Sequence, residues 1–172
     1  MSALLNVFIG MCLLRAAPQD LPFSRFLLGI TVGAYFLVGL GISLADQGMG
    51  LALLSAAVDT GLMIGLAYLG LWIRDFTPRF VQTVTALCGT GVLFELLSWP
   101  LVTALQAQGQ NASSLLALML LALFIWVIAV IGSILRHALE LPLWAGIGIA
   151  LLYVYTSMRV MVALHIAGAS IS

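Results

Sequence analysis

Hydrophobic residues along the chain fall into five long runs, and short breaks of polar and turn-forming residues separate them. As helices, these runs would each cover about 30 Å or more, which matches the hydrocarbon core of a bilayer. Backbone groups in lipid must form hydrogen bonds within their own segment, so we expect helices. The five predicted spans are residues 26–45, 51–73, 80–105, 115–135 and 143–166.

A shorter apolar run, from Ala3 to Leu14, precedes the first span. Its length of about a dozen residues is too small to cross a bilayer, which takes about 20. The run also lacks the basic residues that precede the apolar core of a secretory signal peptide, and Arg15 comes after it instead. We therefore expect a short interfacial helix and then five spans, all in a single transmembrane domain that covers residues 1–172.

The composition agrees with this pattern. Of the 172 residues, 63% are hydrophobic and 7% are charged, and the mean hydropathy is +1.22. An ordinary soluble domain is about half apolar and about a quarter charged, so lipid must be the solvent of this chain. We predict an all-α, polytopic integral membrane bundle whose first partner is the lipid bilayer. The six basic residues form no patch, which argues against nucleic acid as a partner.

The positions of the arginines predict which way the chain crosses the membrane. Two precede the first span, two lie between the second and third spans, and one lies between the fourth and fifth. These five residues are Arg15, Arg25, Arg74, Arg79 and Arg136. The other two connections contain no arginine. Because cytoplasmic connections carry an excess of Lys and Arg, we expect the N-terminus in the cytoplasm and the C-terminus outside.

Three charged residues lie inside the predicted spans, namely Asp59, Glu95 and Arg159. Counted from the expected cytoplasmic end of each helix, they lie about 21, 22 and 24 Å deep, which places them in one layer. A single charge near the middle of a bilayer costs roughly 2.5–3.5 kcal/mol on insertion scales, and pairing with an opposite charge offsets much of this cost. We therefore expect Arg159 to face inward and to bond Glu95, Asp59 or both.

This layer of charges has two main interpretations. In the first, it is a polar clasp that sets how the second, third and fifth spans pack. In the second, it lines a pathway for a proton, an ion or a small solute, because ionisable groups inside a membrane are functional candidates by default. A contact with another subunit is a third interpretation. Side chains one helical turn away would supply further hydrogen bonds: Ser55 for Asp59, Ser98 for Glu95, and Tyr155 and Thr156 for Arg159.

Two glycine pairs at a spacing of four residues predict close helix packing. They are Gly29 with Gly33 in the first span and Gly61 with Gly65 in the second. Glycines at this spacing let helix backbones approach closely, because no side chain separates them. We expect the pairs to serve packing within the chain rather than a dedicated dimer surface.

The sequence carries no recognised catalytic or cofactor-binding motif. His137 and His165 form no His-x-x-x-His pair, and Cys12 and Cys88 sit in apolar runs without a Cys-x-x-Cys motif. A P-loop and a Gly-x-Ser-x-Gly nucleophile elbow are absent as well. We therefore expect no enzyme activity, no metal and no cofactor.

Several stretches resemble the bacterial members of the Yip (Ypt/Rab-interacting protein) superfamily. In those proteins a cytoplasmic loop leads into a span that opens in the manner of RFVQTVTAL, here Arg79 to Leu87, and a later span closes with a short basic turn, here Ile134 to Ala138. The approach to the first span, RAAPQDLPFSR, is also similar. The resemblance implies a five-helix bundle in a bacterial inner membrane without enzyme activity, and it supplies a fold more than a function.

Two functions therefore follow from the sequence. The first is a non-enzymatic membrane scaffold or accessory protein that acts through helix–helix contacts with itself or with another membrane protein. The alternative is a small transporter or channel that uses the layer of Asp59, Glu95 and Arg159. A dry, sealed layer would favour the scaffold, and a cavity that reaches Glu95 would favour the transporter.

Overall fold

The computed structural model describes residues 2–45, 47–108 and 114–169, and within these ranges all regular structure is helical. Five of the six α-helices in this part of the chain are long and apolar enough to cross a membrane. The predicted fold class, an all-α membrane bundle of five spans with a short N-terminal helix, is therefore confirmed. The elements are α1 (Ser2–Cys12), η1 (Pro18–Asp20), α2 (Arg25–Leu44), α3 (Met49–Ile73), η2 (Thr77–Arg79), α4 (Phe80–Gln108), α5 (Ser114–Leu139) and α6 (Leu143–Ala169).

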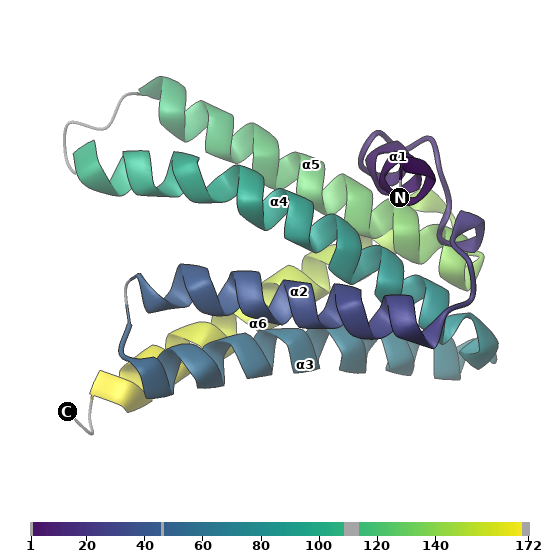
Figure 1. The fold of residues 1–172 in the computed structure, drawn as a ribbon, viewed down its shortest axis with the longest axis horizontal. Helices are drawn as coiled ribbons and strands as arrows, with labels where there is room; N and C mark the ends of the chain where they lie inside the picture. The colour runs from purple at the N-terminus through teal and green to yellow at the C-terminus, as the bar shows by residue number, and fades with distance from the viewer. Residues whose placement is uncertain (1, 46, 109–113, 170–172) are drawn as a thin grey trace.

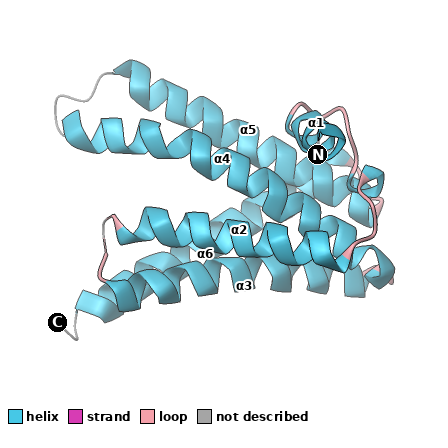
Figure 2. Ribbon diagram, viewed as in Figure 1, coloured by secondary structure: helices cyan, strands magenta, loops and turns pink. Residues whose placement is uncertain are grey.

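The long helices form two groups that meet at one end of the bundle and diverge toward the other (Figure 1). One group is the pair of α4 and α5, and the other contains α2, α3 and α6 (Figure 2). The most extensive contacts are those of α5 with α6 and of α2 with α4, and both of these join the two groups. We call the end where the groups meet the basic end, because it carries Arg25, Arg74, Arg79 and Arg136, and the opposite end the far end.

α5 and α6 cross closely next to the basic end, where two glycines face each other. A Cβ atom at Gly146 would collide with the main-chain oxygen of Gly132, and one at Gly132 would lie 3.0 Å from Cα of Ile147. Glycine permits this approach because any side chain at either position would push the helices apart. Neither glycine belongs to the pairs that the spacing singled out.

The four glycines predicted to pack within the chain do not do so. A Cβ atom would meet nothing within 4 Å at any of the positions Gly29, Gly33, Gly61 and Gly65. On α3, Gly61 and Gly65 are exposed, because they lie about 200° around the helix from the buried residues Met63 and Ala67. The correct spacing is therefore present on the face of the helix that points away from the bundle.

α4 is the most enclosed of the spans, and polar side chains within it are satisfied locally. The hydroxyls of the buried residues Thr83, Thr85 and Thr90 donate to the carbonyl oxygens of the residues four positions earlier, at 2.9, 2.6 and 2.8 Å. Bonds of this kind let small hydroxyls occupy an apolar interior without an unpaired donor. The carboxylate of Glu95 on the same helix has no such solution, because a carboxylate has no hydrogen to donate to a main-chain carbonyl oxygen.

α1 packs against α4 and α5. The ring of Phe8 fills the space that a side chain at Gly89 would need, and Met11 is 1% exposed. The indole Nε1 of Trp126 donates to the main-chain oxygen of Cys12 at 2.7 Å. The predicted short helix is thus present, and its inner face is docked on the bundle.

α5 continues to Leu139, four residues beyond the predicted end of the span at residue 135, so that Arg136 and His137 are helical. The last carbonyls of the helix accept hydrogen bonds from Arg79, whose Nη1 lies 3.3 Å from the oxygen of Ala138, and from Arg74. Arg79 also pairs with Glu140 at 2.6 Å. Cationic groups at a helix C-terminus stabilise it, which explains why the helix extends through these residues.

Candidate functional site

Asp59, on α3, is held by hydroxyl groups from two other helices. Tyr35 on α2 donates to Oδ2 at 2.6 Å, while Ser157 and Tyr153 on α6 donate to Oδ1 at 2.7 and 3.3 Å. Hydrogen bonds to a carboxylate are among the stronger ones in proteins and replace part of the solvation that lipid cannot give. This network, which we call the Asp59 network, ties α2, α3 and α6 together.

The expected partner of Asp59, Arg159, lies elsewhere. Arg159 is exposed on α6, and it forms no ion pair with Asp59 or Glu95 among the residues described. At 100° per residue, Arg159 is about 200° around the helix from Ser157, which faces Asp59. Its neighbour Tyr155 is 62% exposed on the same outer side. The predicted ion-pair clasp is therefore corrected to a hydroxyl network.

The predicted helper residues also take other partners. Ser55 donates to Oε1 of Gln47 at 3.2 Å rather than to Asp59. Ser98 donates to the main-chain oxygen of Glu95 at 3.0 Å rather than to its carboxylate. Thr156 is half-buried, and within the described chain it forms no hydrogen bond to Arg159. The spacing of one turn correctly placed Ser98 beside Glu95, but it could not fix which atom the hydroxyl would choose.

Glu95 reaches from α4 to the surface of α2. A Cβ atom at Gly39 would lie 3.6 Å from its Oε1, so the absence of a side chain there leaves room for the carboxylate. Its Oε2 is buried and has no hydrogen-bond partner in the described part of the molecule. An unpaired buried carboxylate oxygen is costly, so an added hydrogen-bond donor or cation at this position would lower that cost.

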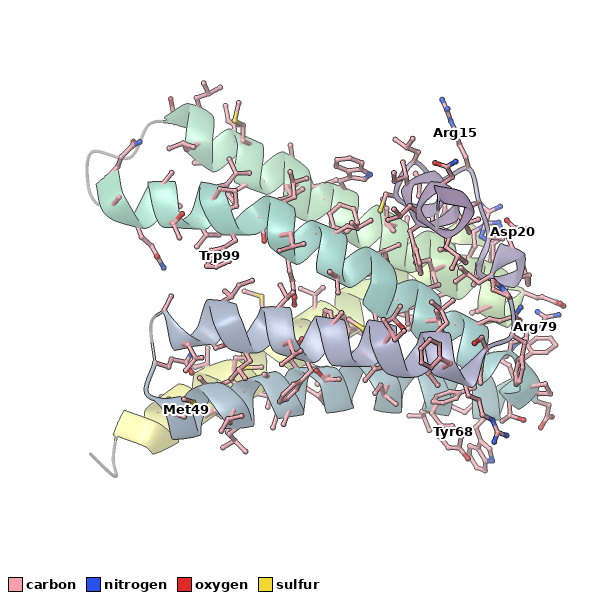
Figure 3. All side chains as sticks on the ribbon, viewed as in Figure 1. Arg15, Asp20, Met49, Tyr68, Arg79 and Trp99 are labelled. Atoms are coloured by element: carbon pink, nitrogen blue, oxygen red, sulfur yellow. The ribbon has the colours of Figure 1, made fainter. Side chains whose placement is uncertain are left out.

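A cavity of about 370 Å³ lies among α2, α3, α4 and α6, and both carboxylates line it. We call it the polar cavity; its polar lining includes Tyr35, Gln47, Asp59, Thr60, Glu95 and Ser98. Thr60 is 7% exposed, and its hydroxyl has no partner among the residues described. From Tyr35 to Ser43 the cavity follows α2 over about 12 Å, and Gln47, which lies beyond the end of α2, also lines it, so the cavity extends to the far end of the bundle. Figure 3 shows Trp99 projecting from α4 toward α2 in this widening region.

A second cavity, of about 280 Å³, adjoins the first and is lined mainly by α4 and α5, with residues of α2, α3 and α6. We call it the apolar cavity; its lining includes Phe94, Leu120, Leu123, Phe124, Val127 and Ile131. Tyr35, Glu95 and Ser98 line both cavities. Glu95 therefore stands at the junction of a polar space and an apolar one.

Sequence reasoning missed the partners of Asp59. Tyr153 and Ser157 are four residues apart and share one face of a helix, and Tyr35 sits in the middle of the first span. These positions carry a weak signal, because hydroxyl groups are less costly in a membrane than charges and are therefore common there. Opposite charge pointed to Arg159 as the partner instead.

Comparisons with models of protein families, with curated proteins and with solved structures find no match for this chain. The resemblance to the Yip superfamily stays a prediction. In the part of the chain that the structure describes, no group of three or more His, Cys, Asp or Glu side chains could hold a metal ion. The function has to be argued from the two cavities and the carboxylates that line them.

Proposed function

We propose that this chain is a small transporter or channel that admits a cationic solute into the polar cavity. The observation that carries the proposal is the lining of that cavity, which contains two carboxylates and, among the described residues, no Arg or Lys. Intramembrane carboxylates that face a cavity are typical of ion and substrate pathways. The clasp interpretation needed a sealed ion pair, and the exposed position of Arg159 does not support it.

The two carboxylates would play different parts. The oxygens of Asp59 already accept hydrogen bonds from three hydroxyls, so Asp59 sets the position of the surrounding helices as well as contributing to the field. Glu95 has a free oxygen, and the Thr60 hydroxyl offers another free acceptor on the same cavity. A cation that enters would satisfy these atoms, which otherwise stay unpaired.

The proposed pathway has a direction. Every arginine except Arg159 lies at the basic end, which supports a cytoplasmic position for that end and for the N-terminus. The polar cavity, which extends to the far end, would then communicate with the outside of a plasma membrane, in a bacterium the inner membrane. A solute would reach Glu95 from that side.

Uptake into proteoliposomes tests the proposal. Purified protein is reconstituted, and the entry of radiolabelled rubidium and tetramethylammonium is compared with that into protein-free liposomes. We expect uptake of at least one probe, its loss in Glu95→Gln, and its retention in Glu140→Gln, which removes a carboxylate at the basic end outside the cavity. Uptake equal to that of protein-free liposomes, or full uptake by Glu95→Gln, would overturn the proposal.

The scaffold is the second candidate function, and one observation favours it. Gly61 and Gly65 are exposed with open space around them, so a helix of another copy or another membrane protein could approach α3 closely. A scaffold of this kind would show no uptake of either probe. It would lose self-association, or capture of its partner, in Gly61→Ile.

A further inference from the structure

The junction at Glu95 is what sets this molecule apart from a simple polar pore. On one side of Glu95 lies the polar cavity, and on the other lies a space whose walls are mostly aliphatic and aromatic side chains. A small hydrated ion would use the first space and gain nothing from the second. A ligand with one charged and one apolar part would fill both.

We propose that the ligand is an amphipathic organic cation, with its ammonium group at Glu95 and its apolar tail in the apolar cavity. This inference deepens the proposed function and rests on it. It assigns a chemical class to the solute and a separate role to each cavity.

The head position is defined by charge and by unpaired acceptors. Oε2 of Glu95 and Oγ1 of Thr60, a side chain 7% exposed, are buried without partners among the described residues. Both residues line the polar cavity, and Asp59 adds a second carboxylate there. The ring of Tyr35 lines both cavities at this level, and aromatic faces attract ammonium groups. An anionic or zwitterionic lipid head would place its negative charge beside two carboxylates.

The tail position is defined by one face of α5. Leu120, Leu123, Phe124, Val127 and Ile131 follow a spacing of three and four residues and so form one apolar stripe along the cavity. Phe94 on α4 closes the opposite side, and its ring contacts Trp126 edge to face at 5.3 Å between centroids. The charged residue of this lining, Glu95, is shared with the polar cavity, so the charge lies where the two cavities adjoin.

Binding of a homologous series of cations tests the assignment. The full-length protein in nanodiscs is titrated with tetramethylammonium and with ethyl-, butyl-, hexyl- and octyltrimethylammonium, and protein-free nanodiscs give the background. We expect the affinity to rise with tail length by up to about fourfold per methylene group, which is the value of burying one methylene. Octanol and octylsulfonate, with the same tail and no positive charge, should bind far more weakly.

Substitutions separate the head from the tail. Val127→Phe reduces the apolar cavity. It should lower the affinity for octyltrimethylammonium by about tenfold, the effect of overpacking a filled space. The same substitution should leave the affinity for tetramethylammonium unchanged. Leu120→Phe is a second variant of the same kind, and Leu121→Phe, on the exposed side of α5, is the matched control without effect. Glu95→Gln should lower the affinity for every cation in the series.

Each possible result of these experiments either supports or overturns a proposal. Binding that depends on both tail length and Glu95 supports the inference. Binding of tetramethylammonium through Glu95 with no gain from longer tails would overturn the inference and leave the proposed function standing. Equal binding of octanol and octyltrimethylammonium would show an apolar lipid site instead, and would also overturn it. Failure of the wild-type protein to take up either rubidium or tetramethylammonium beyond protein-free liposomes would overturn the proposed function itself.

Discussion

At the scale of single residues, the bundle accommodates a carboxylate in an apolar interior without an arginine. Asp59 collects hydroxyl donors from α2 and α6, and each donor also satisfies its own need for an acceptor. Such a network is neutral apart from Asp59 itself. It therefore leaves the carboxylate charge available to the polar cavity, which an ion pair with Arg159 would have cancelled.

Removal of one donor should loosen the network. Tyr35→Phe deletes the shortest bond to Asp59, 2.6 Å, and leaves the aromatic ring in place. We expect the free energy of unfolding to fall by about 0.6 kcal/mol, the average for hydrogen bonds between membrane helices, and by no more than about 1.7 kcal/mol. Tyr155→Phe, an equal change at an exposed position, should have no effect. Thermal unfolding in detergent measures both, and equal melting temperatures for the two variants would contradict the role given to Tyr35.

The error over Arg159 has a physical origin. In a soluble protein, apolar residues mark the face of a helix that turns inward. Around α6 both the lipid and the protein interior are apolar, so hydrophobicity does not distinguish the two faces. Depth could be counted from the sequence, and it placed Asp59 and Glu95 at a level where the structure has them line one cavity. The sequence does not give the rotation of each helix about its axis, so it did not show that Arg159 faces away from the bundle.

At the scale of elements, helix length was predictable and helix packing was not. Hydropathy alone defines all five spans, and the structure shifts their limits by a few residues, as at the end of α5. Close packing depends on which small residues face a neighbour. Gly132 and Gly146 meet between α5 and α6, but they are far apart in the sequence and do not form a spaced pair within one helix.

The crossing of α5 and α6 should be sensitive to a single methyl group. Gly146→Ala places a Cβ against the oxygen of Gly132, which is backbone and cannot move aside alone. We expect a loss of about 1–3 kcal/mol of unfolding free energy, as for overpacked cores. Gly148→Ala, two residues along the same helix, meets nothing within 4 Å and should cause no loss. Chemical unfolding in mixed micelles compares them, and equal stability would show that the crossing is not tight.

At the scale of the whole molecule, the arrangement of the two helix groups creates the site. The basic end is tied by polar bonds between distant segments, such as Gln82 to the oxygen of Leu21 at 2.6 Å and Gln19 to that of His137 at 3.0 Å. From this tied end the two groups diverge toward the far end (Figure 1), and the cavities occupy the space between them. The sequence contains the charges of the site, but it does not show that the two helix groups diverge and leave cavities between them.

Access to the polar cavity can be measured with a thiol probe, because the natural background is low. Cys12 and Cys88 are both buried. Burial also raises the pKa of the Cys12 thiol, which lowers its reactive thiolate fraction at neutral pH. A cysteine introduced as Ser98→Cys lines both cavities, whereas Ser133→Cys, buried in α5, lines neither and is the matched control.

We expect membrane-impermeant methanethiosulfonate reagents to modify Ser98→Cys and to leave Ser133→Cys unmodified. The cationic reagent should react faster than the anionic one, since two carboxylates raise the local concentration of cations and repel anions. Adding Glu95→Gln to Ser98→Cys should reduce this difference by removing one of the two charges. If Ser98→Cys reacts no faster than Ser133→Cys, the cavity is closed to solutes, and the bundle would be a packed scaffold whose carboxylates serve only its own helices.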